Sequence, residues 1–390
     1  MAESRGPASK HWASGLASFV TPDSVPLAQA LLRSPSVTPA DAGAQAVLAH
    51  ALERQGFAVT HLPFGTTPNL FARRGTASPH FCFAGHTDVV SPGGGWTSPP
   101  FEAEIRDETL FGRGAVDMKG AIACFVAACE AHFATPRAGS VSLLITGDEE
   151  GPATDGTTRV LDWMAAHGHI PDLCLVGEPT NPALLGDVVK IGRRGSLNAT
   201  ITVRGTQGHA AYPERADNPV HRLLRTLDAL LAEPLDSGTD WFAPSALQVV
   251  DLCVGNPAFN VIPAEARARL NIRFNDRHTG ATLTAWLTDT LRRHAPDATL
   301  DAHANAEPFL TTPGPLVDRL CDAIERSIGR RPRRDTAGGT SDARFIARHC
   351  PVAEFGLVGA TMHAVDERVP LADLHALSAC YAAILAEFVP

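Results

Sequence analysis

The stretch Phe81-Cys82-Phe83-Ala84-Gly85-His86-Thr87-Asp88 decides the fold, because an apolar run leads directly into a histidine and an aspartate. A short continuous apolar run predicts a strand that is buried on both faces of a sheet. Polar groups after such a strand lie at its carboxyl end, where open α/β sheets form their ligand crevices. The stretch therefore predicts an α/β sheet with a polar site at one edge.

Further strands and helices alternate along the chain on both sides of this site. Buried strands are predicted at residues 141–145 and 173–176, and helices at residues 121–133 and 157–167. Strands separated by helices indicate an α/β domain with a mostly parallel central sheet. The alternation resumes after Gly314 and ends with a predicted helix at residues 371–388.

A different pattern interrupts this alternation. Leu197, Ala199, Ile201 and Val203 occupy one face of a predicted half-exposed strand. Helices and strands are then expected, in chain order, at residues 220–232, 247–254, 266–274 and 281–294. This β-α-β-β-α-β order is typical of a ferredoxin-like α+β unit. We therefore expect a catalytic α/β domain made of residues 1–194 and 308–390, interrupted by an inserted domain at residues 195–307.

Composition narrows the functional classes. A chain of 390 residues is long enough for two domains, and its net charge of −9 argues against a nucleic-acid-binding protein. The sequence has no apolar run long enough for a membrane span, and residues 1–20 lack the apolar core of a secretory signal, so we expect a short disordered or expression-derived lead there. The eight cysteines form no CxxC pair, which favours reduced, buried thiols in a cytoplasmic protein.

Several motifs carry residue types that bind metals. His86 and Asp88 are two positions apart on a strand, so both side chains can face one cation, although such a triplet is usually incidental by itself. Asp117 lies in a glycine-rich stretch just before a predicted helix, where the simpler interpretation is an N-cap. The acids 148–150 follow a strand and taken alone could be a solvated turn. Glu178 follows the strand at residues 173–176, and His363 comes after a further strand predicted at residues 352–357.

The repeated position of these residues is harder to explain by solvation. Acids or histidines stand directly after at least four predicted strands, whereas solvated charges would be scattered. Two histidines with four or five carboxylates suit two zinc ions that share a bridging ligand and jointly activate water.

Five segments resemble the di-zinc aminoacylase and carboxypeptidase superfamily: GHTDVV, GRGAVDMKG, TGDEEG, VGEPT and TMHAVDE. The resemblance covers nearly all of the chain beyond the lead, in the same order. It implies that Asp117 bridges two Zn²⁺ ions, for which Co²⁺ can substitute. His86 and Glu178 would complete the site of one ion, and Glu150 and His363 that of the other.

The same resemblance implies further roles around the metals. Asp88 would orient His86, and Glu149 would be the general base that accepts the proton of water. A cis peptide bond is expected after Asp117. His209 would stabilise the oxyanion from the inserted domain of a partner subunit, so the inserted domain would be both a lid and the dimerisation surface of a homodimer. A strand-end surface histidine is the simpler interpretation of His209.

Further segments narrow the resemblance to the branch that removes succinyl groups: GRRGS, GTQGHAAYP, NVIPAE and GGTSDARF. The implied substrate is the small dicarboxylate amide N-succinyl-LL-2,6-diaminopimelate, in the cytoplasmic route to diaminopimelate and lysine. Arg193 and Arg273 would bind its carboxylates, because the planar guanidinium matches that geometry. For both, a surface cation is the alternative. Neutral hydrogen bonds would come from Ser196, Tyr212, Asn260, Gly339 and Thr340.

Alternative functions remain at this point. Phe259 and Gly359 depart from the pattern of this branch, and both bear on the acyl group rather than on the metals. An N-acetylornithine deacetylase or a dipeptidase would use the same metal site with a different acyl pocket. A non-catalytic scaffold would have lost a ligand or the base, and here none of these residues is missing.

Overall fold

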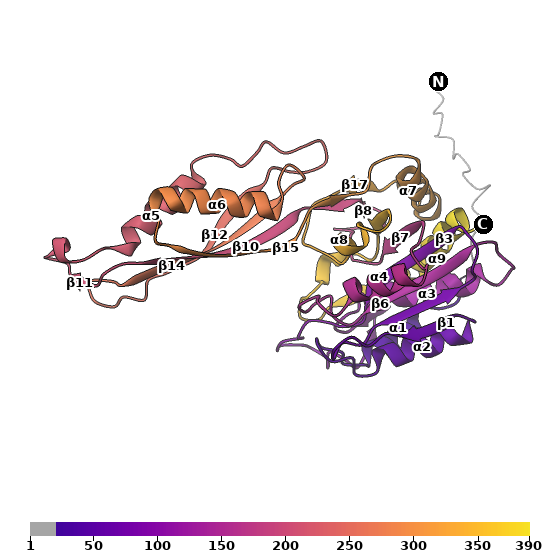
Figure 1. Cartoon of the computed structure of the whole chain (residues 1–390). Coiled ribbons are helices and arrows are strands. Elements are labelled where there is room, and N and C mark those ends of the chain that lie inside the picture. The colour runs from indigo at the N-terminus through magenta and orange to yellow at the C-terminus, as the bar shows by residue number, and fades with distance from the viewer. Residues whose placement is uncertain (1–20) are drawn as a thin grey trace, which may run out of the picture.

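The computed structural model describes residues 21–390, so the predicted N-terminal lead lies outside the described residues. Two sheets organise the chain, and Figure 1 shows the inserted domain extending to one side of the catalytic domain. The larger sheet has eight strands in the order β1 (Ala58–His61), β2 (Leu70–Arg74), β6 (Ser140–Thr146), β3 (His80–His86), β7 (Leu173–Val176), β18 (Val352–Glu354), β8 (Val188–Lys190) and β17 (Arg333–Asp335).

The centre of this sheet is parallel. β3 pairs in parallel with β6 on one side and with β7 on the other, and β18 pairs in parallel with β7. Antiparallel pairing occurs towards the edges, between β1 and β2 and between β2 and β6. The mostly parallel sheet of an α/β domain is confirmed.

Alternation along β3 explains why helices cover both faces. Phe81 and Phe83 enter one apolar core, and Cys82 and Ala84 enter the other. The first core lies under α1 (Val25–Leu32), α2 (Ala44–Arg54), α3 (Lys119–His132), α7 (Pro315–Ile328) and α9 (Leu371–Phe388). The second core lies under α4 (Thr157–Ala166) and α8 (Ala343–Ile346).

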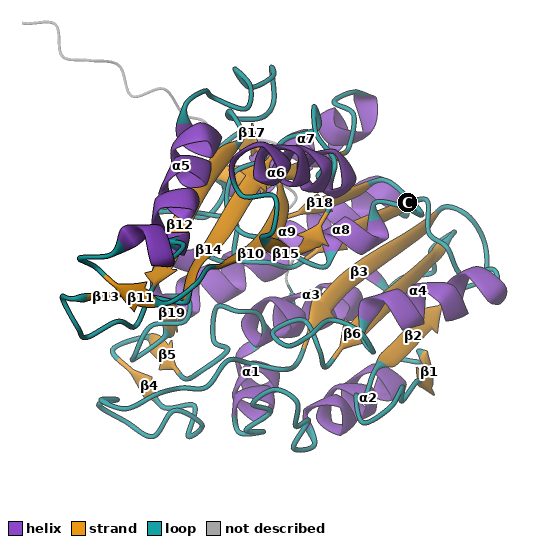
Figure 2. Cartoon of the chain, turned by 60° about the vertical axis from the view of Figure 1, so that its left-hand side comes forward, coloured by secondary structure: helices purple, strands orange, loops and turns teal. Residues whose placement is uncertain are grey.

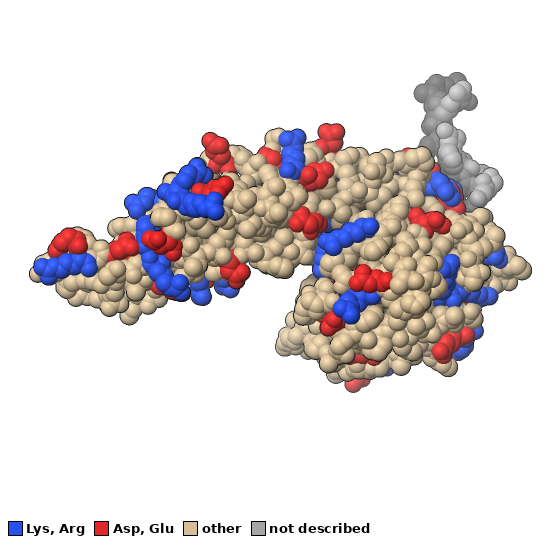
Figure 3. All heavy atoms as spheres, in the orientation of Figure 1, with Lys and Arg blue, Asp and Glu red and all other residues tan. Residues whose placement is uncertain are grey.

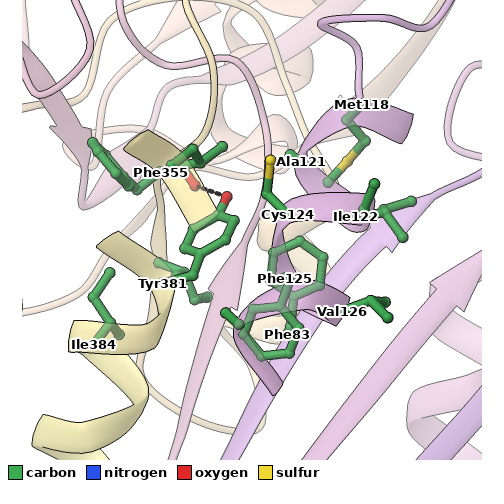
Figure 4. Close-up of a cluster of buried hydrophobic side chains, with 14 of the residues drawn as sticks. Phe83, Met118, Ala121, Ile122, Cys124, Phe125, Val126, Phe355, Tyr381 and Ile384 are labelled. Carbon is green, nitrogen blue, oxygen red and sulfur yellow. Dashed lines mark hydrogen bonds between the residues drawn. The ribbon is translucent and has the colours of Figure 1, made fainter. Parts of the chain in front are cut away.

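Aromatic rings fix the packing of α3 and α9 on the sheet. Figure 4 shows Phe83, Phe125 and Tyr381 in contact, with ring centroids 4.3 Å apart for Phe83 and Phe125. The Tyr381 hydroxyl donates to the Phe355 carbonyl at 2.7 Å, so its polar end is satisfied within the core. α9 has the length and hydropathy of a membrane span, but half of it is buried inside this domain, which accounts for its apolar composition.

The inserted domain has the predicted element order. Its four-stranded antiparallel sheet runs β12 (Ala246–Cys253), β14 (Glu265–Phe274), β10 (Gly195–Arg204) and β15 (Thr299–Ala306). α5 (Pro219–Leu231) connects β10 to β12, and α6 (Gly280–His294) connects β14 to β15. Leu197, Ala199, Ile201 and Val203 are buried under these helices, as the alternation predicted. This is the ferredoxin-like arrangement.

Two small ladders lie at the two ends of the inserted domain. At its outer end β11 (Gly208–His209) pairs with β13 (Val261–Ile262), next to the 3-10 helix η1 (Pro213–Arg215). At the inner end β9 (Gly192–Arg193) pairs with β16 (Phe309–Leu310). The second ladder ties together the two chain segments that cross between the domains, close to the boundaries expected at 194/195 and 307/308.

A third, three-stranded sheet lies in the catalytic domain. It is built from β4 (Ile105–Arg106), β5 (Thr109–Phe111) and β19 (Arg368–Pro370), with β5 in the middle. A second 3-10 helix, η2 (Gly359–Thr361), precedes β19. The strand predicted at residues 352–357 is shorter than expected, because β18 ends at Glu354 and the following residues continue as buried loop.

Thiols and surface charges agree with the composition. Seven of the eight cysteines are buried and unpaired, and Cys253 on the edge strand β12 is exposed. On the face shown in Figure 3, acidic and basic side chains intermingle over both domains. This face therefore shows no broad basic field of the kind that nucleic-acid-binding proteins present.

Candidate metal centre

The carboxyl ends of three adjacent parallel strands place the candidate residues together. His86 is the last residue of β3 and pairs in register with Thr146 of β6, so Glu149 and Glu150 leave the sheet beside it. On the other side Ala84 pairs with Val176 of β7, two residues before Glu178. The strand order β6-β3-β7 thus brings the three motifs to one edge of the sheet, as the sequence predicted.

Asp117 lies between two histidines. Its Oδ1 is 3.2 Å from His86 Nε2, and its Oδ2 is 3.2 Å from His363 Nε2. The expected cis peptide bond between Asp117 and Met118 is present. Met118, not Asp117, is the N-cap of α3 and makes no side-chain cap hydrogen bond. The N-cap interpretation of Asp117 is therefore wrong.

The ligand atoms form overlapping sets that share Asp117. One set is His86, Asp117 and Glu178, and a second is Asp117, Glu150 and His363. Within each set the candidate atoms lie within 4.8 Å of one another. Because one carboxylate belongs to both sets and turns one oxygen to each histidine, the donors match a pair of divalent cations with a bridging aspartate.

A third group places Glu149 beside this pair. Glu149 and Glu150 lie with His86 in a set of potential ligand atoms that also spans no more than 4.8 Å. Glu150 is already engaged with His363, whose Nε2 is 2.8 Å from Glu150 Oε1. Among the described residues Glu149 makes no such hydrogen bond to a histidine, which distinguishes its carboxylate from that of Glu150.

The pKa values of the buried groups show that carboxylates are crowded together at this centre. Burial and the neighbouring charge of Glu178 raise the pKa of Glu149 well above its ordinary value. Burial and the charge of Asp117 raise the pKa of Glu178 to about 8. Hydrogen bonds to Asp117 and Glu150 raise the pKa of His363 to about 10. Carboxylates this close retain protons unless other positive charge neutralises them, which divalent cations would supply.

The bridging position of Asp117 has the opposite electrostatic signature. Burial alone would raise its pKa, but hydrogen bonds from His363 and His86 hold that pKa below its ordinary value. For His86, burial lowers the pKa, yet hydrogen bonding to Asp117 overcomes it and the pKa is raised well above the usual value. Asp117 is thus the anion that the surrounding donors favour most.

Asp88 was expected to orient His86, and it does so through its backbone rather than through its side chain. His86 Nδ1 lies 2.9 Å from the backbone oxygen of Asp88 and 3.7 Å from the carboxylate. The carboxylate instead accepts from the backbone amides of Glu149 at 3.3 Å and Glu150 at 3.1 Å, and from the Thr38 hydroxyl at 2.6 Å. The main chain of Asp88 fixes the imidazole, and its side chain fixes the loop that carries the other two acids.

The guanidinium of Arg193 is paired with a carboxylate of the protein. Arg193 donates through Nε and Nη2 to Glu354, which is fully buried at the end of β18. Its Nη1 donates to the Gly339 carbonyl at 3.2 Å, and Ser341 also donates to Glu354. Binding of a substrate carboxylate by Arg193 therefore stays a prediction, while its Nε and Nη2 neutralise the buried carboxylate of Glu354.

The other expected substrate contacts divide between the two ends of the inserted domain. Ser196 and Arg273 are paired in register on β10 and β14, at the inner end of the sheet. Gly339 is tied to this region through Arg193, and Thr340 follows it in the chain. Four of the expected contact residues therefore lie where the domains meet, namely Ser196, Arg273, Gly339 and Thr340.

His209, Tyr212 and Asn260 lie at the outer end. His209 is in β11, the Tyr212 ring is 5.6 Å from its imidazole, and the Asn260 carbonyl accepts from Ala210 at 2.9 Å. Figures 1 and 2 both show β11 well away from β3 and β6, whose ends carry the metal ligands. Within one chain these three residues are therefore grouped with each other but not with the metal centre.

Sequence reasoning missed residues that support the centre without belonging to it. Thr38 and Glu354 are examples, since one holds Asp88 and the other holds Arg193. Asp148, the first of the three consecutive acids, is buried and accepts from the amides of Thr154 and Asp155. The run of acids predicted a polar strand end, but nothing in its spacing showed which member is structural.

Comparisons with known proteins agree with this geometry. A sequence model described as peptidase family M20/M25/M40 matches residues 82–387. A succinyl-diaminopimelate desuccinylase of Gluconacetobacter diazotrophicus is 63% identical over 376 residues, which cover 94% of this chain and 98% of the relative. The enzyme of the same name from Acidiphilium cryptum is 62% identical, over 93% of this chain and 98% of the relative.

Solved structures share the fold at low sequence identity. The aminopeptidase PepT of Bacillus cereus superposes with a TM-score of 0.77 at 19% identity, covering 94% of this chain and 98% of that one. The metallo-carboxypeptidase Sso-CP2 of Sulfolobus solfataricus gives a TM-score of 0.76 at 16% identity, with 94% and 99% covered. These similarities concern the two-domain fold.

Proposed function

Because the chain belongs to peptidase family M20/M25/M40, we propose that it hydrolyses the amide bond of N-succinyl-LL-2,6-diaminopimelate to succinate and LL-2,6-diaminopimelate. One observation supports hydrolysis above all: two potential ligand sets share the carboxylate of Asp117. The succinyl substrate follows from relatives that carry this activity in their name and match nearly the whole chain at 62–63% identity. The enzyme is a metal-dependent amide hydrolase of diaminopimelate and lysine biosynthesis.

The side chains around Asp117 define the chemistry. When bound, two divalent cations, for which we propose Zn²⁺ with Co²⁺ as a substitute, lower the pKa of water and polarise the amide carbonyl. His86, Asp117 and Glu178 would hold one cation, and Asp117, Glu150 and His363 the other. Glu149 accepts the proton of the attacking water and returns it to the leaving amine. A carboxylate placed in this way typically contributes about 10²–10⁴-fold to the rate.

Substrate carboxylates require cations that the protein does not already neutralise. Arg193 is committed to Glu354, so Arg273, beside Ser196 at the inner end of the inserted domain, is the expected carboxylate-binding arginine. Burial and the neighbouring charge of Arg194 both lower the pKa of Arg273, which agrees with a site that attracts anions. Gly339 and Thr340 would supply neutral hydrogen bonds, and Arg193 would shape the site by holding the Gly339 carbonyl.

His209, Tyr212 and Asn260 are proposed to act on a partner subunit. Their position at the outer end of the inserted domain supports this, because a second chain could bring that end to the metal centre of the first. We therefore propose a homodimer in which His209 donates a hydrogen bond to the oxyanion across the subunit interface. Preorganised donors of this kind are commonly worth roughly 3–4 kcal/mol of transition-state stabilisation. We propose a cytoplasmic location, without a nucleic-acid or membrane partner.

Paired assays test the substrate. Metal-free protein is loaded with two equivalents of Zn²⁺ and assayed on N-succinyl-LL-2,6-diaminopimelate, N-acetylornithine and a dipeptide. We expect kcat/KM to be highest for the succinyl substrate. The Arg273→Met variant should lose most of this preference through a raised KM, because a distal carboxylate needs a cation and an acetyl group does not. Faster turnover of N-acetylornithine by the unaltered enzyme would instead assign a deacetylase.

A further inference from the structure

A buried ion pair outside the ligand sets joins the two chain segments that carry Asp117 and His363. Arg113 is 1% exposed and Glu367 is 0% exposed. Arg113 Nη1 donates to Glu367 Oε2 at 2.5 Å, across 254 positions of sequence. A buried ion pair loses its hydration, and further hydrogen bonds must compensate for that loss. The other hydrogen bonds of Arg113 and Glu367 therefore identify the groups that the pair positions.

Glu367 turns its second oxygen to the backbone of the bridging ligand. Its Oε1 accepts from the amide of Val116 at 2.9 Å and from the amide of Asp117 at 3.2 Å. Its own carbonyl accepts from the amide of Gly112 at 2.9 Å. Because Asp117 must present one oxygen to each ligand set, the orientation of this backbone affects both sets.

Arg113 turns its other terminal nitrogen to the backbone of the histidine ligand. Its Nη2 donates to the His363 carbonyl at 3.2 Å and to the Pro92 carbonyl at 3.4 Å. His363 has a φ of 60°, in the left-handed region that non-glycine residues seldom adopt. A charged donor on this carbonyl favours the conformation that aims the imidazole at Asp117.

The small three-stranded sheet brings the two segments together. β5 and β19 are antiparallel, with Phe111 opposite Arg368 and Leu110 opposite Val369. Gly112 follows β5 and Glu367 precedes β19, so the ion pair lies directly at the end of this ladder. The ladder sets the approach of the segments, and the side chains set the angle at which Asp117 and His363 face each other.

We propose that the Arg113–Glu367 pair positions Asp117 and His363, and so controls the affinity for the cation that Asp117, Glu150 and His363 would hold. The inference rests on the proposed function, because it concerns the same ligands. Neither residue belongs to the ligand sets found among residues 21–390. Packing alone does not require the remaining hydrogen bonds of both side chains to go to the main chain of proposed ligands, as they do here at Asp117 and His363.

The first test is Glu367→Gln. Glutamine can still accept from the amides of Val116 and Asp117, but its amide N–H₂ faces Arg113 and breaks the ion pair. Titration of metal-free protein with Zn²⁺ in a calorimeter should show two ions for the unaltered protein. In the variant, one of the two ions, the one that Asp117, Glu150 and His363 would hold, should bind about 10–100-fold more weakly. An effect of this size is typical when a supporting partner of a ligand is removed. The visible spectrum of the Co²⁺-loaded protein should change with it.

Asp236→Asn is the matched control. Asp236 also accepts from backbone amides, those of Gly238 at 2.7 Å and Ser245 at 3.2 Å, but it lies in the inserted domain. It also pairs with His278 at 3.1 Å. This control should lower the unfolding temperature while leaving both metal affinities and the Co²⁺ spectrum unchanged.

The double variant Arg113→Met with Glu367→Leu decides the question if Glu367→Gln folds poorly. Apolar residues of similar size often replace a buried pair without loss of stability, but they cannot hold the Asp117 amide or the His363 carbonyl. Weakened binding of the ion proposed to lie at Asp117 and His363 in this folded variant supports the inference. Affinities equal to those of the unaltered protein would overturn it. Failure of the unaltered protein to bind two ions would instead count against the proposed function.

Discussion

At the scale of single residues, the carboxylates of the centre differ in their contacts with the two histidines. Asp117 faces both histidines, Glu150 faces His363, and Glu178 approaches His86 at 3.7 Å. Glu149 has no such partner among the residues that the structure describes, and its amide is held by Asp88. This difference separates the proposed base from the proposed ligands.

Replacing the base should separate catalysis from metal binding. In Glu149→Gln the ligand sets that share Asp117 remain intact, so the protein should still bind two Zn²⁺ ions. Turnover should fall by at least about 10²–10⁴-fold, because no group remains to accept the proton. Steady-state kinetics and metal analysis of the same sample check both points. Loss of the metals together with activity would show that Glu149 is a ligand.

A buried histidine predicts a specific acid sensitivity. Burial lowers the pKa of His80 to about 4, and its Nε2 is 2.8 Å from the Ser142 hydroxyl. In the unfolded chain this histidine takes up a proton below about pH 6.5, whereas the folded protein does so only near pH 4. The free energy of unfolding should therefore fall as the pH drops from 6.5 to 4, by on the order of 3 kcal/mol from this group.

The variant His80→Gln isolates that contribution. Chemical unfolding of metal-free protein at pH 7 and pH 4.5 should show a smaller loss of stability for this variant than for the unaltered protein. His61→Gln, at an exposed position of β1, serves as the control and should behave like the unaltered protein. Equal losses in all three proteins would mean that His80 is not the group responsible.

The sequence was most informative about individual ligands and least informative about their supports. His86, Glu150 and Glu178 come after apolar runs, so the hydrophobic pattern alone predicts their place near strand ends, whereas His363 lies beyond η2 rather than at the end of β18. Arg113, Glu367 and Glu354 have no such signature, because burial of a charge depends on a partner that is distant in sequence. The pairing of Arg193 with Glu354 was not predicted for the same reason, because a guanidinium suits the carboxylate of a substrate and that of the protein equally well.

At the scale of elements, tight contact between strand ends fixes the site. Gly356 follows β18, and a Cβ at this position would overlap the carbonyl oxygens of Gly177 and Glu178. The backbone of the β18 end therefore approaches the Glu178 segment more closely than any side chain would permit. The close approach sets the position from which Glu178 reaches His86.

Gly356→Ala should displace Glu178. Overpacking of this kind typically destabilises a protein by about 1–3 kcal/mol, and here it should also weaken the binding of the ion held by His86 and Glu178. Thermal unfolding and Zn²⁺ titration measure the two effects. Gly94→Ala is the control, because its Cβ would meet nothing within 4 Å. A Gly356→Ala protein with normal metal affinity would show that the contact does not position the ligand.

Sequence periodicity predicted the elements well where packing is regular. β7 has the predicted bounds, and the five helices that were predicted with bounds (α3, α4, α5, α6 and α9) differ from them by at most two residues at either end. The error in β18 arises because residues 355–357 are apolar and buried without being strand. Burial on its own does not distinguish a strand from a packed loop. The β4–β5–β19 sheet was not predicted, since its short strands lack a clear period.

At the scale of the whole molecule, the inserted domain separates the chemistry into two places. The metal ligands lie at the edge of the large sheet, whereas His209 lies at the far end of the ferredoxin-like unit (Figure 1). The sequence predicted both groups, and the resemblance assigned His209 to a partner subunit, but the pattern of each domain alone does not determine how far apart the two groups lie within one chain. The proposed homodimer would bring His209 of one subunit to the metal centre of the other.

Mixed dimers test this assembly. Glu149→Gln and His209→Ala should each be nearly inactive alone, one for lack of a base and the other for lack of the oxyanion donor. After exchange of subunits, a heterodimer would contain one complete site, so about a quarter of all sites should regain activity at equal mixing. No recovery, despite heterodimers shown by native mass spectrometry, would mean that His209 does not act across the interface.

The measurement closest to the central claim is a crystal structure with Zn²⁺, using anomalous scattering recorded on either side of the zinc absorption edge. Two peaks roughly 3.5–4 Å apart are expected, with one oxygen of Asp117 on each. His86 and Glu178 should contact one peak, and Glu150 and His363 the other. A single peak, or peaks bound by other residues, would contradict the account.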